Sequence, residues 1–121
     1  MKQQTDILHN LDHELPQPLS QVQEVLFLLL TRGGQTRRDL MVDAWVLNAP
    51  QCISLLRGQG IKVKTKTLEH TNQFGRAAEY GMYWLDKEDQ EEARQKYKQM
   101  VAYSEKVLKQ KYLVNEWTPE L

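Results

Sequence analysis

The apolar residues of this chain change their spacing at a single glycine, Gly60. Before it, the stretch "APQCISLLRG" (residues 49–58) carries apolar side chains at helical spacing: Ile53, Leu55 and Leu56. After it, "IKVKTKT" (residues 61–67) alternates apolar residues or threonine with lysine, which is typical of a half-buried strand. One element cannot hold both periods. The sequence therefore predicts a helix that ends close to Gly60 and a strand that follows it directly.

A shorter helix is predicted just upstream. Thr36 is placed to cap "RRDLMVDAWVL", with Asp39 three residues later in the manner of a capping box. The expected apolar face of this helix is formed by Leu40, Met41, Ala44 and Trp45. Pro50 suits the first turn of the next helix, because its missing N–H would have no partner there. Two short helices joined by a tight turn, with glycine closing the second, form the helix-turn-helix pattern.

The strand after Gly60 is expected to return as a hairpin. The polar, glycine-containing link "LEHTNQFGRAAE" is followed by "YGMYWL" (residues 80–85), whose aromatic residues favour a strand. A hairpin that follows a helix-turn-helix is a wing.

Helices are also predicted on both sides of this unit. Ser20 can cap "QVQEVLFLLLTRGG", in which apolar residues recur at helical spacing: Val22, Val25, Leu26, Leu29 and Leu30. A short leading helix is predicted from Thr5 or Asp6 to the residues before Pro16. Residues 86–113 contain no Gly or Pro and place acids at the start and lysines at the end, which complements a helix dipole.

The domain organisation follows from these elements and the length of the chain. With 121 residues, of which 40% are hydrophobic, the chain is long enough for one core and too short for two sizeable ones. We predict a mainly α fold with a small β-hairpin (α+β class). Its parts are a short helix and linker (1–19), a winged helix-turn-helix domain (20–85), and a long C-terminal helix with a tail (86–121).

Charge is distributed unevenly along the chain, although the formal net charge is zero. Residues 35–85 carry seven bases and four acids, whereas the segments on either side are acidic overall. Between Arg57 and Arg76, five bases stand against Glu69 alone. The neutral total argues against a nonspecific polyelectrolyte binder, but the basic centre favours an anionic partner at that place.

Other functional classes lack the residues they need. The longest apolar run, "VLFLLL", is far shorter than the roughly 20 residues of a membrane span, and the first residues do not make a secretory signal. A lone Cys52 favours a reducing cytoplasm. His9 and His13 lie in "HNLDH", which lacks the glutamate of a zinc-protease motif, and His70 has no partner at ligand spacing. No phosphate cradle or nucleophilic triad stands out, so we expect no metal, cofactor or enzymatic activity.

Candidate base contacts lie on the second helix of the pair. Gln51, Ser54 and Arg57 point away from its expected apolar face. Gln pairs with adenine and Arg with guanine through two hydrogen bonds, and Ser can bond to either. The alternative is that all three are ordinary solvated helix residues.

Candidate phosphate contacts follow on the strand. Lys62, Lys64 and Lys66 are expected on one face, about 6.5 to 7 Å apart, close to the spacing of phosphates along one DNA strand. The alternative is that these lysines protect an edge strand against aggregation.

Two further groups complete the predicted site. In the wing loop, Arg76 can enter a minor groove or contact phosphate, with Asn72 and Gln73 in support. Arg37 and Arg38, at the start of the first helix of the pair, are placed for flanking phosphates.

Over residues 22–85 the chain resembles the small winged helix-turn-helix domains that are common in bacteriophage, prophage and mobile-element proteins. The likeness rests on "TRRDLMVDAWVLNAPQCISLLRGQGIKVKTKT", in which Asn48 and Pro50 open the second helix. It continues in "NQFGRAAEYGMYWL", where the family's wing has a similar Asn, Phe-Gly and basic residue before a Tyr-containing strand. The resemblance implies sequence-specific binding of double-stranded DNA by a cytoplasmic, nucleoid-associated regulator or accessory protein, with Asn48 among the contacts.

The long C-terminal helix leaves two roles open. A mixed stripe runs along it: Tyr97, Met100, Val101, Ser104, Leu108 and Tyr112. The stripe either packs back on the winged core or pairs with a second copy. We favour a homodimer, because two copies on neighbouring half-sites bind more tightly than one. The alternative function is a protein-interaction adaptor, in which the winged scaffold binds a host or phage protein instead of DNA.

Overall fold

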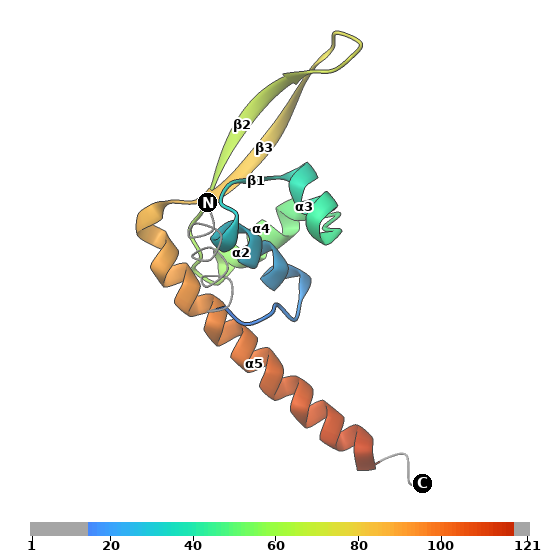
Figure 1. Cartoon of the computed structure of the whole chain (residues 1–121), viewed down its shortest axis with the longest axis vertical. Helices are drawn as coiled ribbons and strands as arrows, with labels where there is room; N and C mark the ends of the chain where they lie inside the picture. The colour runs from blue at the N-terminus through green and yellow to red at the C-terminus, as the bar shows by residue number, and fades with distance from the viewer. Residues whose placement is uncertain (1–14, 118–121) are drawn as a thin grey trace, which may run out of the picture.

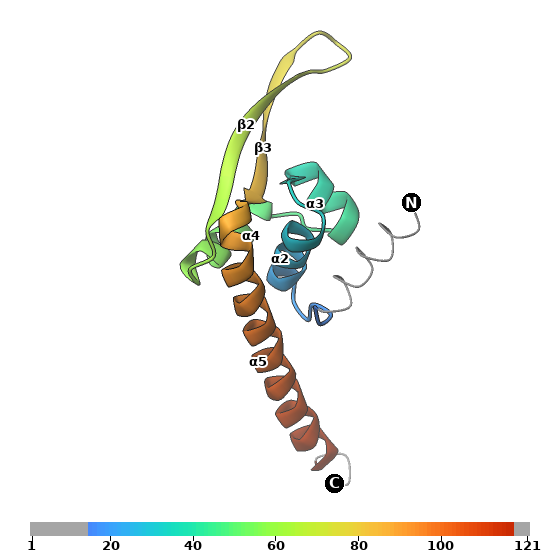
Figure 2. The same ribbon diagram turned by 60° about the vertical axis from the view of Figure 1, so that its left-hand side comes forward.

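The computed structural model describes the backbone of residues 15–117 and the side chains of residues 15–111. Its elements in chain order are α2 (Gln21–Thr31), β1 (Gln35–Thr36), α3 (Arg37–Ala44), α4 (Ala49–Gly58), β2 (Val63–Thr71), β3 (Ala77–Leu85), the 3-10 helix η1 (Lys87–Asp89) and α5 (Gln90–Trp117). The β2–β3 hairpin projects from one end of a helical body and α5 from the opposite end (Figures 1 and 2). The predicted α+β class is confirmed. The leading helix predicted before Pro16 lies outside the described residues.

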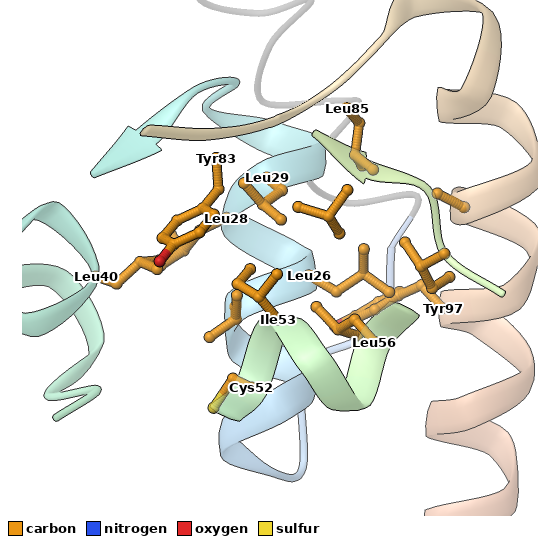
Figure 3. Close-up of a cluster of buried hydrophobic side chains, with 14 of the residues drawn as sticks. Leu26, Leu28, Leu29, Leu40, Cys52, Ile53, Leu56, Tyr83, Leu85 and Tyr97 are labelled. Atoms are coloured by element: carbon orange, nitrogen blue, oxygen red, sulfur yellow. The ribbon is translucent and has the colours of Figure 1, made fainter. Parts of the chain in front are cut away.

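The core is built around α2. Ser20 lies in extended backbone before this helix, and its hydroxyl accepts a hydrogen bond from the Gln23 backbone N–H at 3.2 Å, as expected of the predicted cap. Val25, Leu26 and Leu29 are fully buried. Figure 3 shows Leu26 and Leu29 among side chains from α4, the base of the hairpin and α5. One core therefore joins the helix pair, the hairpin and the long helix.

The predicted helix pair is present as α3 and α4, joined by residues 45–48. The capping box of α3 is complete: the Asp39 N–H donates to Thr36 Oγ1 at 3.1 Å, and the Thr36 N–H donates to Asp39 Oδ2 at 3.0 Å. Asn48 caps α4, and Pro50 lies in its first turn. The predicted starts of both helices are therefore confirmed.

The predicted apolar faces of these helices were partly wrong. α3 ends at Ala44, because Trp45 takes the left-handed backbone conformation (φ 55°) and turns the chain away. Met41 and Trp45 are exposed, and so is Leu55 on α4. Short helices contact the core along a narrow stripe, and residues at its margins face solvent even when they are apolar.

The sheet has the strand order β1-β3-β2 and is antiparallel throughout. Its hairpin is longer than the sequence indicated: the register runs from the pair of Val63 with Leu85 to the pair of Thr71 with Ala77. The strand β1, which was not predicted, pairs Gln35 with Tyr83. This extra strand fastens the start of α3 to the base of the hairpin.

The N-terminal half of α5 packs against α2. Ala93, Tyr97 and Val101 are buried. The Tyr97 hydroxyl donates to the Pro16 carbonyl at 2.7 Å, and the Tyr97 ring centroid lies 5.9 Å from that of Phe27. Packing of the long helix back on the core, which the sequence left open, is the arrangement found here.

This packing corrects the predicted dimerisation stripe. Tyr97 and Val101 are enclosed within their own chain, and Ser104 accepts a hydrogen bond from Gln23 Nε2 at 2.8 Å. Met100 packs against the core from its edge. These four side chains are not available as a continuous dimer face. Leu108 lies beyond the core and is exposed, while Tyr112 falls outside the residues whose side chains are described.

Candidate nucleic-acid interface

The outward face of α4 carries Gln51, Ser54 and Gly58. These residues are exposed, and at about 100° per residue they lie opposite the buried side of the helix, which includes Ile53 and Leu56. The side chain of Asn48 accepts a hydrogen bond from the Gln51 backbone N–H at 3.4 Å, and its Nδ2 donates to Gln51 Oε1 at 2.9 Å. Asn48, predicted as a DNA contact, is therefore a helix cap that orients the Gln51 side chain.

Two other elements border this face of α4. On one side, Leu55 and Gln59 line a shallow groove together with Met100 and Tyr103 of α5. On the other side, Arg57 reaches the base of the hairpin. The outward face is thus a strip between the hairpin and the long helix.

Arg57 holds the hairpin to α4. Its Nε and Nη2 donate to the Val63 carbonyl oxygen at 3.0 and 2.8 Å, and its Nη2 also donates to the Thr65 hydroxyl. A bidentate contact to guanine would need two neighbouring N–H groups of the guanidinium. Nε and both N–H groups of Nη2 are engaged within the chain, so neither fork of the guanidinium is free. Arg57 is therefore a positioning residue, and its predicted role as a guanine contact does not fit the structure.

The predicted row of three lysines is divided. Lys62 precedes β2, and its Nζ lies 3.9 Å from Asp89 Oδ1. Lys64 and Lys66 are exposed on β2, but alternation along the strand places them on the sheet face opposite Thr65, which contacts Arg57. The lysines of β2 and the outward residues of α4 therefore do not share one surface. Strand periodicity was correct, but the sequence could not show which sheet face packs against α4.

The sheet face on the α4 side is not basic. Glu69 pairs with Glu79 in the register, and alternation places both on the same face as Thr65. Both glutamates are exposed. Like charges directly opposite one another repel each other and also repel phosphate. This flat face of the hairpin is therefore unsuited to a DNA backbone.

The hairpin tip, residues 72–76, is held by one side chain. Asn72 Oδ1 accepts hydrogen bonds from the backbone N–H groups of Phe74 and Arg76 at 2.9 and 3.0 Å. The Gly75 N–H donates to the Asn72 carbonyl at 3.0 Å, and Gly75 has a φ of 81°. Asn72 thus shapes the tip instead of supporting a ligand contact, while Gln73 and Arg76 are exposed as a DNA contact requires. Phe74, also exposed, was not predicted as a site residue.

Arg37 and Arg38 lie at the start of α3 and are exposed. They directly follow β1, whose Thr36 pairs with Met82 on the edge of β3 away from β2. The two arginines therefore flank the base of the hairpin on the side opposite the lysines of β2. This position is compatible with the predicted contact to flanking phosphates.

The Cys52 thiol and a cluster of three carboxylates are the two remaining candidate reactive groups, and each has a structural explanation. Burial, with a smaller contribution from the charge of Glu24, raises the pKa of the Cys52 thiol, which keeps it protonated. Asp86, Glu88 and Asp89 bring carboxylate oxygens within 4.8 Å of one another. However, Asp86 accepts a hydrogen bond from Trp84 Nε1, and Asp89 faces Lys62.

A surface that the sequence analysis missed lies on α3 and the turn after it. We call it the α3 apolar surface, and it consists of Met41, Val42, Trp45 and Leu47. Trp45 is 81% exposed and Leu47 is 70% exposed. Met41 and Trp45 were predicted to face the core, whereas Val42 and Leu47 were assigned no role.

Neither a family model, a curated protein nor a solved structure matches the chain. None of the helices in the described part of the chain has the length and apolar character needed to cross a membrane. The function must therefore be argued from the geometry alone.

Proposed function

We propose that the protein binds double-stranded DNA with sequence preference through α4 and the hairpin tip. The observation that carries the proposal is that two accessible elements, α4 and the hairpin, are held together. The outward face of α4 presents Gln51 and Ser54, and the hairpin, fastened to the same helix by Arg57, presents Arg76 at its far end. A helix of this kind fits a major groove, and a projecting tip fits the neighbouring minor groove.

Several of the predicted contacts that remain accessible have a role in this arrangement. Gln51 and Ser54 contact base edges, with Gln51 oriented by Asn48. Arg37 and Arg38 contact phosphates beside α3. Lys64 and Lys66, on the outer face of the hairpin, add a sequence-independent attraction for a backbone passing alongside.

The biological role that fits is a regulator or accessory protein of a phage or mobile element, which acts by occupying its site. The exposed half of α5, which carries Val107 and Leu108, is proposed to join two copies. Two copies would bind half-sites related by a two-fold axis, so the preferred sequence should be palindromic.

The test is selection from a random duplex pool with the full chain, followed by binding titrations on the enriched fragment. Gln51→Ala should weaken binding to that fragment by about fivefold or more while leaving random duplex unaffected. Gln95→Ala, at an exposed position in the N-terminal half of α5 and outside the half proposed to join two copies, is the matched control and should change neither. If the pool is not enriched, or if both variants behave alike, the assignment of α4 as the recognition helix is refuted.

A second candidate function is supported by the α3 apolar surface. Contiguous exposed apolar side chains on a soluble chain often mark a protein contact. An adaptor that uses this surface should bind weakly to a column of random duplex at low salt. This weak binding should not depend on the salt concentration. Retention that is strong, salt-dependent and unchanged by Trp45→Ser would exclude the adaptor as the sole function.

A further inference from the structure

The hairpin tip exposes an aromatic side chain that neither its own fold nor the contacts proposed above require. Phe74 is 85% exposed, the highest value among the large apolar side chains that the structure describes. We propose that Phe74 is a wedge that enters duplex DNA from the minor groove and unstacks one base step, bending the duplex. This inference rests on the proposed DNA-binding function and names how the tip acts on its ligand.

The turn itself does not need an aromatic residue at this position. Asn72 supplies the side-chain acceptor, and Gly75 supplies the positive φ of 81°. The Phe74 backbone N–H is bound to Asn72 Oδ1, so its backbone position is set independently of its side chain. The backbone that carries the ring is therefore held in place, which lowers the entropy lost when the ring inserts.

The shape of the hairpin suits entry into a narrow groove. Next to the tip, the residues on β3 are Ala77 and Ala78, and Ala77 pairs with Thr71. The small side chains on β3 reduce the width of this end of the ribbon, although His70 stands opposite Ala78 on β2. Both views show the hairpin extending well beyond the helical body before it curves at its far end (Figures 1 and 2). The tip can therefore reach a groove while α4 lies on the same duplex.

Charge sets the depth of entry. The acidic pair of Glu69 and Glu79 lies two positions below the last strand pair, Thr71 with Ala77, which is about 7 Å along the strands. A minor groove is about 7.5 Å deep. The tip can thus occupy the groove before the glutamates meet the phosphates, and Arg76 enters with it.

Entry of the tip and insertion of the ring support each other. The two strands of the hairpin lie about 4.8 Å apart, and the minor groove is about 6 Å wide, so side chains fit only if the groove opens. An apolar side chain that wedges between base pairs kinks the duplex toward the major groove and opens the minor groove. Phe74 would supply this wedge, and Arg76 would contact a phosphate at the edge of the opened groove.

The experiment compares two duplexes of about 40 base pairs that differ in one central mismatched pair. A mismatched step is easier to unstack, so a wedge binds it more tightly. The full chain should prefer the mismatched duplex by about three- to tenfold, and 2-aminopurine placed beside the mismatch should brighten on binding. Phe74→Ala should lose both effects while still binding intact duplex. Arg76→Ala, the control at the same tip, should weaken binding to both duplexes alike and keep the preference.

The outcomes separate this inference from the proposed function. If the full chain binds neither duplex in a salt-dependent way, DNA binding itself is refuted and the wedge with it. If it binds both duplexes equally, or if Phe74→Ala keeps the preference, DNA binding stands and the wedge is overturned. Because Phe74 is exposed, the Phe74→Ala variant should fold normally. An unchanged thermal midpoint will show that any lost preference for the mismatched duplex does not come from unfolding.

Discussion

Replacing Arg57 separates a structural role from a base-contacting role. In the structure, its guanidinium donates to the Val63 carbonyl and the Thr65 hydroxyl, and so ties α4 to the hairpin. Arg57→Ala should therefore lower stability and loosen the hairpin relative to the helix. If Arg57 instead contacted guanine, the same change would alter sequence preference and leave stability unchanged.

The expected magnitude follows from these hydrogen bonds. Bonds to a charged group contribute about 1.5 to 3 kcal/mol each when shielded, but Arg57 is exposed, so we take about 1 to 2 kcal/mol for the whole set. An unfolding entropy of about 2.1 cal/mol/K per residue gives about 0.25 kcal/mol/K for this chain. Arg57→Ala should thus lower the thermal midpoint by about 4 to 8 °C.

Calorimetry on the full chain measures this shift, and binding titrations on several duplexes measure the effect on recognition. Arg57→Lys is the matched control: it keeps the charge but lacks the fork, so it should recover less than half of the lost stability. A double-mutant cycle with Thr65→Val should reveal coupling, because the two side chains share a hydrogen bond. A midpoint within about 1 °C of the parent, together with a lost preference at one base pair, would refute the structural role.

Four further outcomes follow from single features of the fold. Burial raises the pKa of the Tyr97 hydroxyl above its ordinary value, so Tyr97 contributes fully to stability below about pH 10 and less as the pH rises further. In the Tyr97→Phe variant, the thermal midpoint should therefore fall less steeply with pH above about pH 10. Gly60→Ala should cost about 1 to 2 kcal/mol in urea unfolding, because Gly60 has a φ of 87° and a Cβ there would displace Lys96 from the Gln59 and Gly60 carbonyls that follow α4. Thr36→Ala should cost about 1 kcal/mol in the same assay through loss of the capping box, and an unchanged urea midpoint would contradict the assigned cap. Lys64→Ala should reduce by about one unit the slope of the logarithm of the duplex-binding constant against the logarithm of salt concentration. Lys62→Ala should leave this slope unchanged, because the Lys62 ammonium faces Asp89.

The local structure of this protein could be predicted from its amino-acid sequence. The predicted caps at Ser20 and Thr36 act through bonds to residues within one helical turn, so their signals are complete in a short stretch of chain. The change of period at Gly60 likewise depends only on side-chain alternation. For these reasons the helices of the pair, the hairpin and the α+β class were predictable without coordinates.

The tertiary structure alone decided which surfaces are free. Whether the lysines of β2 lie beside α4 depends on which face of the sheet packs against that helix. Whether Arg57 is free to contact bases depends on the distance between its guanidinium and the Val63 carbonyl. Both are contacts between separate elements. The same holds for the stripe on α5, where burial of Tyr97 against α2 removed a predicted dimer face, and for Phe74, whose exposure depends on the length of the hairpin. Local sequence specifies how a segment folds, but accessibility is a property of its neighbours, and these are chosen by packing of the whole chain.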